Sequence, residues 1–181
     1  MTCIVGMVSG GKVYIAGDSA GVCGEDLQSR KDSKVFRTGP YIMGFTSSFR
    51  MGQVLRYSFN PPNPPRSECE LHRFMVNDFV ESLREAFKKA GCASGEGGTE
   101  RGGTFLVGVH GRLFIVDADY QVGESRFPYN AVGSGAQVAL GAMFATNKGH
   151  MPYVQLDMAL EAAEAFCTGV RAPFSHVETM E

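Results

Sequence analysis

The chain of 181 residues is long enough to bury a sizeable apolar core, and we expect a single domain over residues 1–181. The formal net charge is −2 and the 17 Lys and Arg are scattered along the sequence, which argues against a dedicated nucleic-acid-binding face. No apolar run approaches the length of a membrane span, and the five cysteines include no CxxC pair. We therefore expect a cytoplasmic protein with neither a membrane nor a nucleic-acid partner.

Two β-hairpins are predicted near the N-terminus. Residues 3–8 and 13–16 are apolar and rich in β-branched side chains, and a Ser-Gly-Gly-Lys turn joins them. Residues 34–37 and 41–45 flank a Gly-Pro turn in the same way. Three hydroxyl residues then precede a predicted helix over residues 49–59, where they can cap its N-terminus.

The middle of the chain changes pattern several times. Residues 60–65 contain four prolines and predict an extended connector. Apolar residues recur at helical spacing over residues 71–87, which predicts a helix. Residues 90–103 are glycine-rich and polar and predict a mobile loop. Residues 104–109 and 112–116 predict another pair of strands.

The last third of the chain predicts helices over residues 136–145 and 154–170 and an edge strand over residues 174–177. Because the strands come in hairpin pairs, antiparallel sheets are favoured over a Rossmann-type parallel sheet. The sequence therefore predicts an α+β fold with helices packed outside antiparallel sheets.

Thr2 is the first candidate functional residue. Removal of Met1 would leave a hydroxyl and a free α-amine on one residue, and an α-amine with a pKa of about 8 can accept a proton near neutral pH. A hydroxyl beside its own amine is one of the known ways to activate a threonine nucleophile. Read alone, Met-Thr is also a common start to a protein.

Five short motifs together resemble a known enzyme family. TCIVG at residues 2–6, GKVYIAGD at 11–18 and the dipeptide Lys34-Val35 resemble the opening of proteasome β-subunits, and they are closer still to the bacterial HslV peptidase. IMGF at 42–45 and VGSG at 132–135 resemble that family's strand before the first helix and its turn before the third. The resemblance implies an N-terminal nucleophile hydrolase, a four-layer αββα sandwich with two antiparallel sheets between helical layers.

The resemblance also implies roles for five residues. Thr2 would be the nucleophile with its α-amine as base, and Lys34 would favour deprotonation beside it. Asp18 would pair with Lys34, the Gly44 N–H would form the oxyanion hole and Ser134 would bind the N-terminal amine. Read singly, Asp18 can form an Asx-turn and Lys34 can be a solvated charge. Gly44 can be a close-packing point in a strand, and Ser134 can belong to a helix-capping box.

By position, the resemblance places a substrate pocket around Gly21, Asp32, Ile42 and Thr46. If Asp32 points into this pocket, it should attract a basic substrate side chain. If it faces solvent in its polar loop, it contributes almost nothing to specificity.

The chemistry requires no cofactor, and the cysteines and histidines show no zinc-binding spacing. The resemblance to HslV nevertheless implies a structural Na⁺ held by backbone carbonyls, for which the matching residues are Glu164, Cys167 and Val170. The Asp that the family carries near its fourth helix has no counterpart in this sequence.

The implied function is a threonine endopeptidase that degrades peptides and proteins within a ring-shaped homo-oligomer. An ATP-dependent unfoldase is a candidate partner. Two alternatives stay open on the same fold. One is a catalytically inactive structural or assembly subunit, which retention of Met1 would favour because the amine would be blocked. The other is an amidohydrolase of small molecules.

Overall fold

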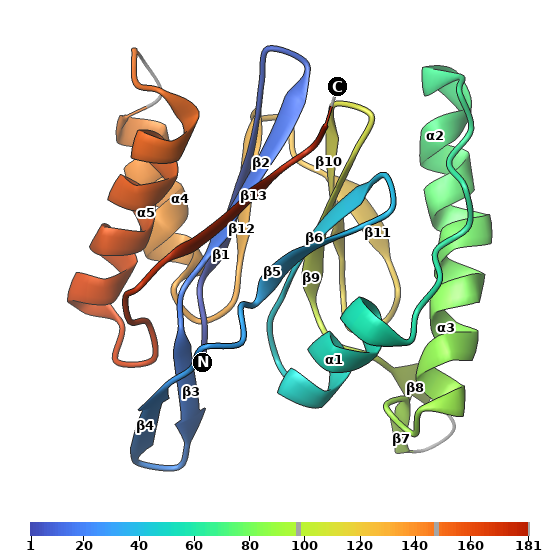
Figure 1. Cartoon of the computed structure of the whole chain (residues 1–181), viewed down its shortest axis with the longest axis horizontal. Helices are drawn as coiled ribbons and strands as arrows, with labels where there is room; N and C mark the ends of the chain where they lie inside the picture. The colour runs from blue at the N-terminus through green and yellow to red at the C-terminus, as the bar shows by residue number, and fades with distance from the viewer. Residues whose placement is uncertain (97–98, 147–148, 181) are drawn as a thin grey trace.

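Two β-sheets lie face to face, with helices on both outer faces (Figure 1). The computed structural model describes residues 1–96, 99–146 and 149–180. The strands are β1 (Ile4–Ser9), β2 (Lys12–Gly17), β3 (Ala20–Cys23), β4 (Asp26–Ser29), β5 (Val35–Thr38), β6 (Tyr41–Phe45), β7 (Ser94–Glu96), β8 (Thr99–Arg101), β9 (Phe105–Val109), β10 (Arg112–Val116), β11 (Val122–Glu124), β12 (Tyr129–Val132) and β13 (Ser175–Glu178). The helices are α1 (Phe49–Tyr57), α2 (Glu68–Phe74), the π-helical turn η1 (Met75–Phe79), α3 (Val80–Lys89), α4 (Ala136–Ala145) and α5 (Pro152–Phe166).

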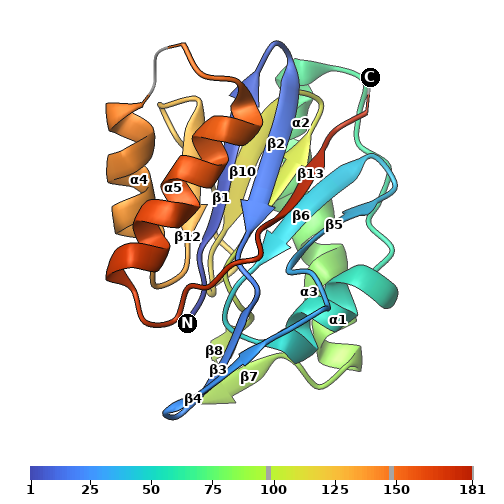
Figure 2. The same ribbon diagram turned by 60° about the vertical axis from the view of Figure 1, so that its left-hand side comes forward.

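The strand pairs of both main sheets are antiparallel. The first sheet has the order β12-β1-β2-β13, and the second has the order β11-β10-β9-β6-β5. Helices α4 and α5 cover the outer face of the first sheet and helices α1 to α3 that of the second, as Figures 1 and 2 show from two directions. The predicted αββα sandwich is confirmed.

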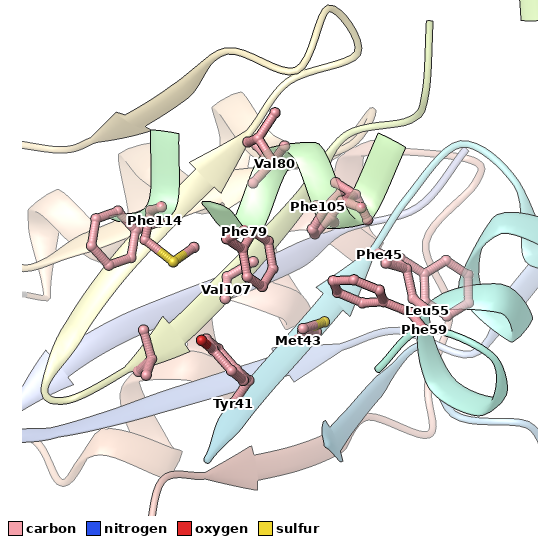
Figure 3. Packing of buried hydrophobic residues seen from close by; sticks show 14 of the residues in the cluster. Tyr41, Met43, Phe45, Leu55, Phe59, Phe79, Val80, Phe105, Val107 and Phe114 are labelled. Atoms are coloured by element: carbon pink, nitrogen blue, oxygen red, sulfur yellow. The ribbon is translucent and has the colours of Figure 1, made fainter. Parts of the chain in front are cut away.

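Three apolar clusters fill the spaces between these layers. The second sheet and helices α1 to α3 enclose the most aromatic one, in which Tyr41, Phe79 and Phe105 are fully buried (Figure 3). Small residues such as Ala159 dominate the cluster under α4 and α5, and aliphatic residues such as Ile15 fill the space between the sheets. Full burial of one large apolar side chain contributes about 1.5–3 kcal/mol, so these clusters hold the strand ends in fixed positions.

Most predicted elements are present. The three predicted hairpins form as β1–β2, β5–β6 and β9–β10, and β13 pairs with β2 at the edge of its sheet. The helix predicted over 71–87 extends from α2 through η1 to α3. The helix predicted over 154–170 ends at Phe166, because the next residue, Cys167, is already extended.

Some elements differ from the expectations. The loop predicted over residues 90–103 contains a small hairpin, β7–β8, and its residues 97 and 98 lie outside the described ranges. The predicted elements include no counterpart of strands β3, β4, β11 and β12. Strand β4 is wholly exposed and β11 has only three residues, so these two strands leave little pattern in the sequence. Among the described helices, none combines the length and apolar character that crossing a membrane requires.

Candidate active site

Three polar side chains are buried together where β1 begins, β2 ends and β5 begins. The Nζ of Lys34 donates hydrogen bonds to Thr2 Oγ1 at 2.7 Å and to Asp18 Oδ1 at 2.8 Å. Thr2 is 5% exposed, and Asp18 and Lys34 are each 2% exposed. The sheet therefore brings three of the sequence-predicted site residues into one contact network.

The backbone around Asp18 fixes its carboxylate. Antiparallel pairing of β1 with β2 brings the chain before β1 beside the chain after β2. Asp18 accepts hydrogen bonds from the N–H of Cys3 at 3.0 Å and from the N–H of Ala20 at 2.9 Å. The contact with Ala20 is the Asx-type turn considered from the sequence, so Asp18 shapes the turn and binds Lys34 at the same time.

Burial controls the ionisation of this site. Burial lowers the pKa of Lys34 below its ordinary value, while the charge and the hydrogen bond of Asp18 oppose the shift. The ammonium group therefore releases its proton more readily than that of an exposed lysine. Burial raises the pKa of Cys3 to about 12, so its thiol stays protonated and is a poor nucleophile.

The N-terminal backbone is held by the turn before α4. The backbone N–H of Thr2 donates to Ser134 Oγ at 3.1 Å, and Ser134 Oγ donates to the Thr2 carbonyl at 3.3 Å. The N–H of Gly135 donates to the same carbonyl at 3.2 Å. A capping-box role for Ser134 is not observed, because Gly135 is the N-cap residue and α4 has no side-chain cap. Ser134 therefore binds the nitrogen that becomes the α-amine when Met1 is removed.

Gly133 allows this turn to approach the N-terminus. Its φ is +101°, and a Cβ at this position would lie 2.3 Å from the Thr2 carbonyl oxygen. The matched control is Gly10, which has a φ of +57° but no heavy atom within 4 Å of the position that a Cβ would take.

We expect Gly133→Ala to destabilise the protein by more than Gly10→Ala. The left-handed backbone alone costs alanine about 1–2 kcal/mol, and the clash with Thr2 adds about 1–3 kcal/mol. The measurement is the free energy of unfolding in urea, and equal losses in the two variants would contradict the close approach.

Gly44 is part of the sheet interior. Phe45 N–H donates to the Lys34 carbonyl at 3.1 Å on one side, and Thr46 N–H donates to the Thr104 carbonyl at 3.0 Å on the other. Because N–H groups alternate along a strand, the Gly44 N–H faces its ladder partner Leu106. A Cβ on Gly44 would lie 2.5 Å from Ile4 Cγ2, so the glycine is a close-packing point between the sheets. This geometry leaves the Gly44 N–H in the ladder rather than free for an oxyanion hole.

Ser47, the residue after Thr46, offers a free backbone donor that the sequence did not predict. It has a φ of +69°, and within the described ranges its N–H makes no hydrogen bond. The preceding Thr46 is 5% exposed. Its Cγ2 lies 3.3 Å from the position that a Cβ on Gly133 would take, and the Thr2 carbonyl oxygen lies 2.3 Å from the same position. A serine with this φ cannot be recognised from sequence, where a glycine would have signalled the conformation.

The four predicted pocket residues do not share one pocket. Asp32 lines a pocket with Phe45, Phe49 and their neighbours on α1. Thr46 lies beside the Thr2 backbone, and Ile42 is fully buried in the cluster between the sheets. Gly21 is covered by Arg30, whose Cδ lies 2.7 Å from the position of a Cβ on Gly21.

Asp32 is already paired. Arg30 binds its carboxylate in a bidentate manner, through Nε at 2.8 Å and Nη2 at 2.6 Å. These hydrogen bonds hold the pKa of Asp32 below its usual value. The carboxylate is therefore neutralised from within the chain.

The predicted cation site is occupied by a side chain. Nη1 of Arg171 donates to the carbonyl of Val170 at 2.9 Å and to that of Glu164 at 3.5 Å, and the Cys167 carbonyl accepts from the Val170 N–H at 3.2 Å. A guanidinium charge thus already lies on two of the three carbonyls. The residues do not fit an additional monovalent cation.

No protein-family model matches the sequence, and no curated protein does. Solved structures do match the fold. BPH of Thiobacillus denitrificans superposes with a TM-score of 0.82 and 22% identity, covering 99% of this chain and 98% of that one. A second structure of BPH is a complex with epoxomicin.

Two further structures extend the comparison. The eukaryotic HslV of Trypanosoma brucei gives a TM-score of 0.71 and 16% identity over 99% of this chain and 100% of that one. A Gly-1 mutant of Anbu from Hyphomicrobium sp. strain MC1 superposes with a TM-score of 0.67 and 15% identity. The match covers 100% of this chain and 82% of that one. The chain therefore has the fold of the proteasome-like and HslV-like N-terminal nucleophile hydrolases.

Proposed function

We propose that this protein is a threonine peptidase with Thr2, freed by removal of Met1, as its nucleophile. The observation that carries the proposal is the Lys34 Nζ, which bridges Thr2 Oγ1 and Asp18 Oδ1 inside a buried site. A lysine and a carboxylate are costly to bury, so their burial against the Thr2 hydroxyl favours a functional role over a purely structural one.

The proposed reaction proceeds through an ester on Thr2. Its Oγ attacks the carbonyl carbon of the scissile peptide bond while the α-amine accepts the hydroxyl proton. Lys34 stabilises the negative charge that develops on Oγ, and Ser134 orients the amine. The C–N bond then breaks, the leaving amine takes the proton, and water hydrolyses the ester to regenerate Thr2.

The oxyanion donor in this proposal is the N–H of Ser47 instead of that of Gly44. An oxyanion hole needs a main-chain donor that is free in the resting site and fixed by its surroundings. The Ser47 N–H meets the first requirement. Helix α1 meets the second, because it begins two residues later and Ser48 caps it by accepting the Met51 N–H.

We also propose that the protein self-associates, as the likeness to HslV implies. Large apolar side chains are exposed on the outer helical layer, including Phe144 at 68% and Phe166 at 80%. Phe127 packs edge-on against Phe144 with ring centroids 6.2 Å apart and is itself 52% exposed. Clustered aromatic groups of this kind favour a protein partner, and a second copy of the chain agrees with the ring expected from the sequence.

The test of the peptidase proposal is hydrolysis of short fluorogenic peptides by the purified protein. Turnover that is lost in Thr2→Ala supports it. A folded, Met1-free protein without any turnover would instead favour the inactive structural subunit. The structure of BPH holds epoxomicin, so we propose that the same compound also binds this chain at Thr2.

A further inference from the structure

A pocket of about 100 Å³, partly open to solvent, is lined by residues just before β5, at the end of β6 and on α1. Its wall includes Phe49, whose ring centroid is 5.7 Å from the same Lys34 Nζ that contacts Thr2 Oγ1. Phe45 forms a second aromatic wall, and Arg56 reaches the pocket from α1. The pocket therefore shares Phe49 with the surroundings of Lys34, which makes it the candidate for a substrate side chain next to the scissile bond.

The acidic group of the pocket is not available to a substrate. Asp32 accepts both bonds of the Arg30 guanidinium, and the Cζ of Arg30 also stacks 3.9 Å from the centroid of the Phe49 ring. This arrangement satisfies the carboxylate and holds the arginine in place. A basic substrate side chain would have to displace Arg30 to reach Asp32.

Arg56 is the second guanidinium near Asp32, and its charge adds to that of Arg30 in lowering the pKa of the Asp32 carboxyl. Its Cζ lies 5.3 Å from the ring centroid of Tyr57 and 5.8 Å from that of Phe36, so aromatic faces hold it. In the part of the chain that the structure describes, Arg56 forms no salt bridge. Arg30, Asp32 and Arg56 together carry one net positive charge, and Arg56 is the one of the two arginines that makes no hydrogen bond to Asp32 within the described residues.

We propose that this pocket selects an acidic residue, Glu or Asp, immediately before the cleaved bond, and that Arg56 is the residue that determines this specificity. The inference rests on the peptidase function proposed for Thr2. Guanidinium groups bind carboxylates through paired, charge-assisted hydrogen bonds, and the walls of Phe45 and Phe49 can contact the methylene groups of a glutamate. The preference is opposite to the basic one that Asp32 suggested from the sequence.

The experiment uses four peptides that differ only before the scissile bond, with Glu, Gln, Leu or Arg. The Glu and Gln peptides have nearly the same shape, so their ratio of kcat/KM isolates the charge. We expect a ratio of about tenfold or more in the wild-type protein, the effect of one hydrogen-bonded charge pair. Arg56→Gln should bring the ratio close to one while turnover of the Leu peptide is retained.

A control variant and a charge-reversal variant complete the test. Arg73→Gln removes the same charge from an exposed position on α2 and should leave the Glu-to-Gln ratio unchanged. Arg56→Glu should make the Arg peptide a better substrate than the Glu peptide.

Two negative results are distinguishable. If the Leu and Arg peptides are cleaved through Thr2 but Glu has no advantage over Gln, the specificity inference is overturned and the peptidase assignment stands. If no peptide is cleaved in a Thr2-dependent manner, the peptidase assignment and the inference both fail.

Discussion

Thr2→Ala should abolish peptide hydrolysis, with kcat/KM reduced by about 10⁴-fold or more, while the protein stays folded. Loss of a covalent nucleophile removes the whole reaction path rather than one stabilising contact. The structural cost is small, because Lys34 keeps its bond to Asp18 and only the 2.7 Å contact with Thr2 Oγ1 disappears. A lost side-chain hydrogen bond of this kind typically costs about 0.5–1.5 kcal/mol.

Thr2→Ser is the matched control. It retains the hydroxyl and, after removal of Met1, the adjacent amine, and we expect it to keep measurable turnover of the same peptides. The two variants are compared by fluorogenic assay after circular dichroism has established equal folding. Normal turnover by Thr2→Ala would exclude Thr2 as the nucleophile.

Lys34→Met should lower both activity and stability. The side chains of Lys34 and Asp18 are 1% and 0% exposed, so removal of the lysine leaves a carboxylate buried without its counter-ion. Breaking a buried pair in this way costs about 3–5 kcal/mol. Hydrolysis should fall by about 10²-fold or more, because the charge that stabilises the Thr2 oxygen is lost.

The double variant Lys34→Met/Asp18→Asn separates these two effects. Replacement of both charges removes the unpaired carboxylate, so part of the unfolding free energy in urea should return. Activity should not return with it, because the double variant still lacks the ammonium group beside Thr2. Recovery of hydrolysis together with stability would show that Lys34 has only a structural role.

The sequence predicted the fold well where its signals were local. Paired apolar runs with Gly-containing turns predicted β1–β2 and β5–β6, and the spacing of Leu71 through Phe87 predicted the long helical segment. Strand β4 was invisible because its four residues are exposed and have no apolar periodicity. Its pairing with β3 is a tertiary property that propensity does not encode.

The residues of the candidate site were likewise predicted only in part. Thr2, Asp18 and Lys34 could be found because they belong to motifs in the family's order, and the structure brings them into contact. The resemblance implied that Gly44 supplies the oxyanion donor, whereas the free N–H belongs to Ser47, whose φ of +69° its residue type does not reveal.

The pairing of charged groups was not accessible from the sequence. The contact of Arg30 with Asp32 depends on where the β3–β4 hairpin ends, and that of Arg171 with two carbonyls depends on the chain after α5. Both changed the predicted chemistry. One neutralises the expected acidic pocket residue, and the other places a guanidinium on two of the carbonyls expected to hold Na⁺.

Thr2 can act with a free α-amine only after removal of Met1, which stands directly against the site. Met1 is 56% exposed, and its Sδ lies 4.0 Å from Thr168 Oγ1, so the residue is reachable for removal. The most direct measurement is the intact mass of the active protein before and after incubation with epoxomicin. We predict a mass lower than that of the full sequence by one methionine, and a second species heavier by one epoxomicin that is absent in Thr2→Ala. Hydrolytically active protein that retains Met1 throughout would contradict the mechanism.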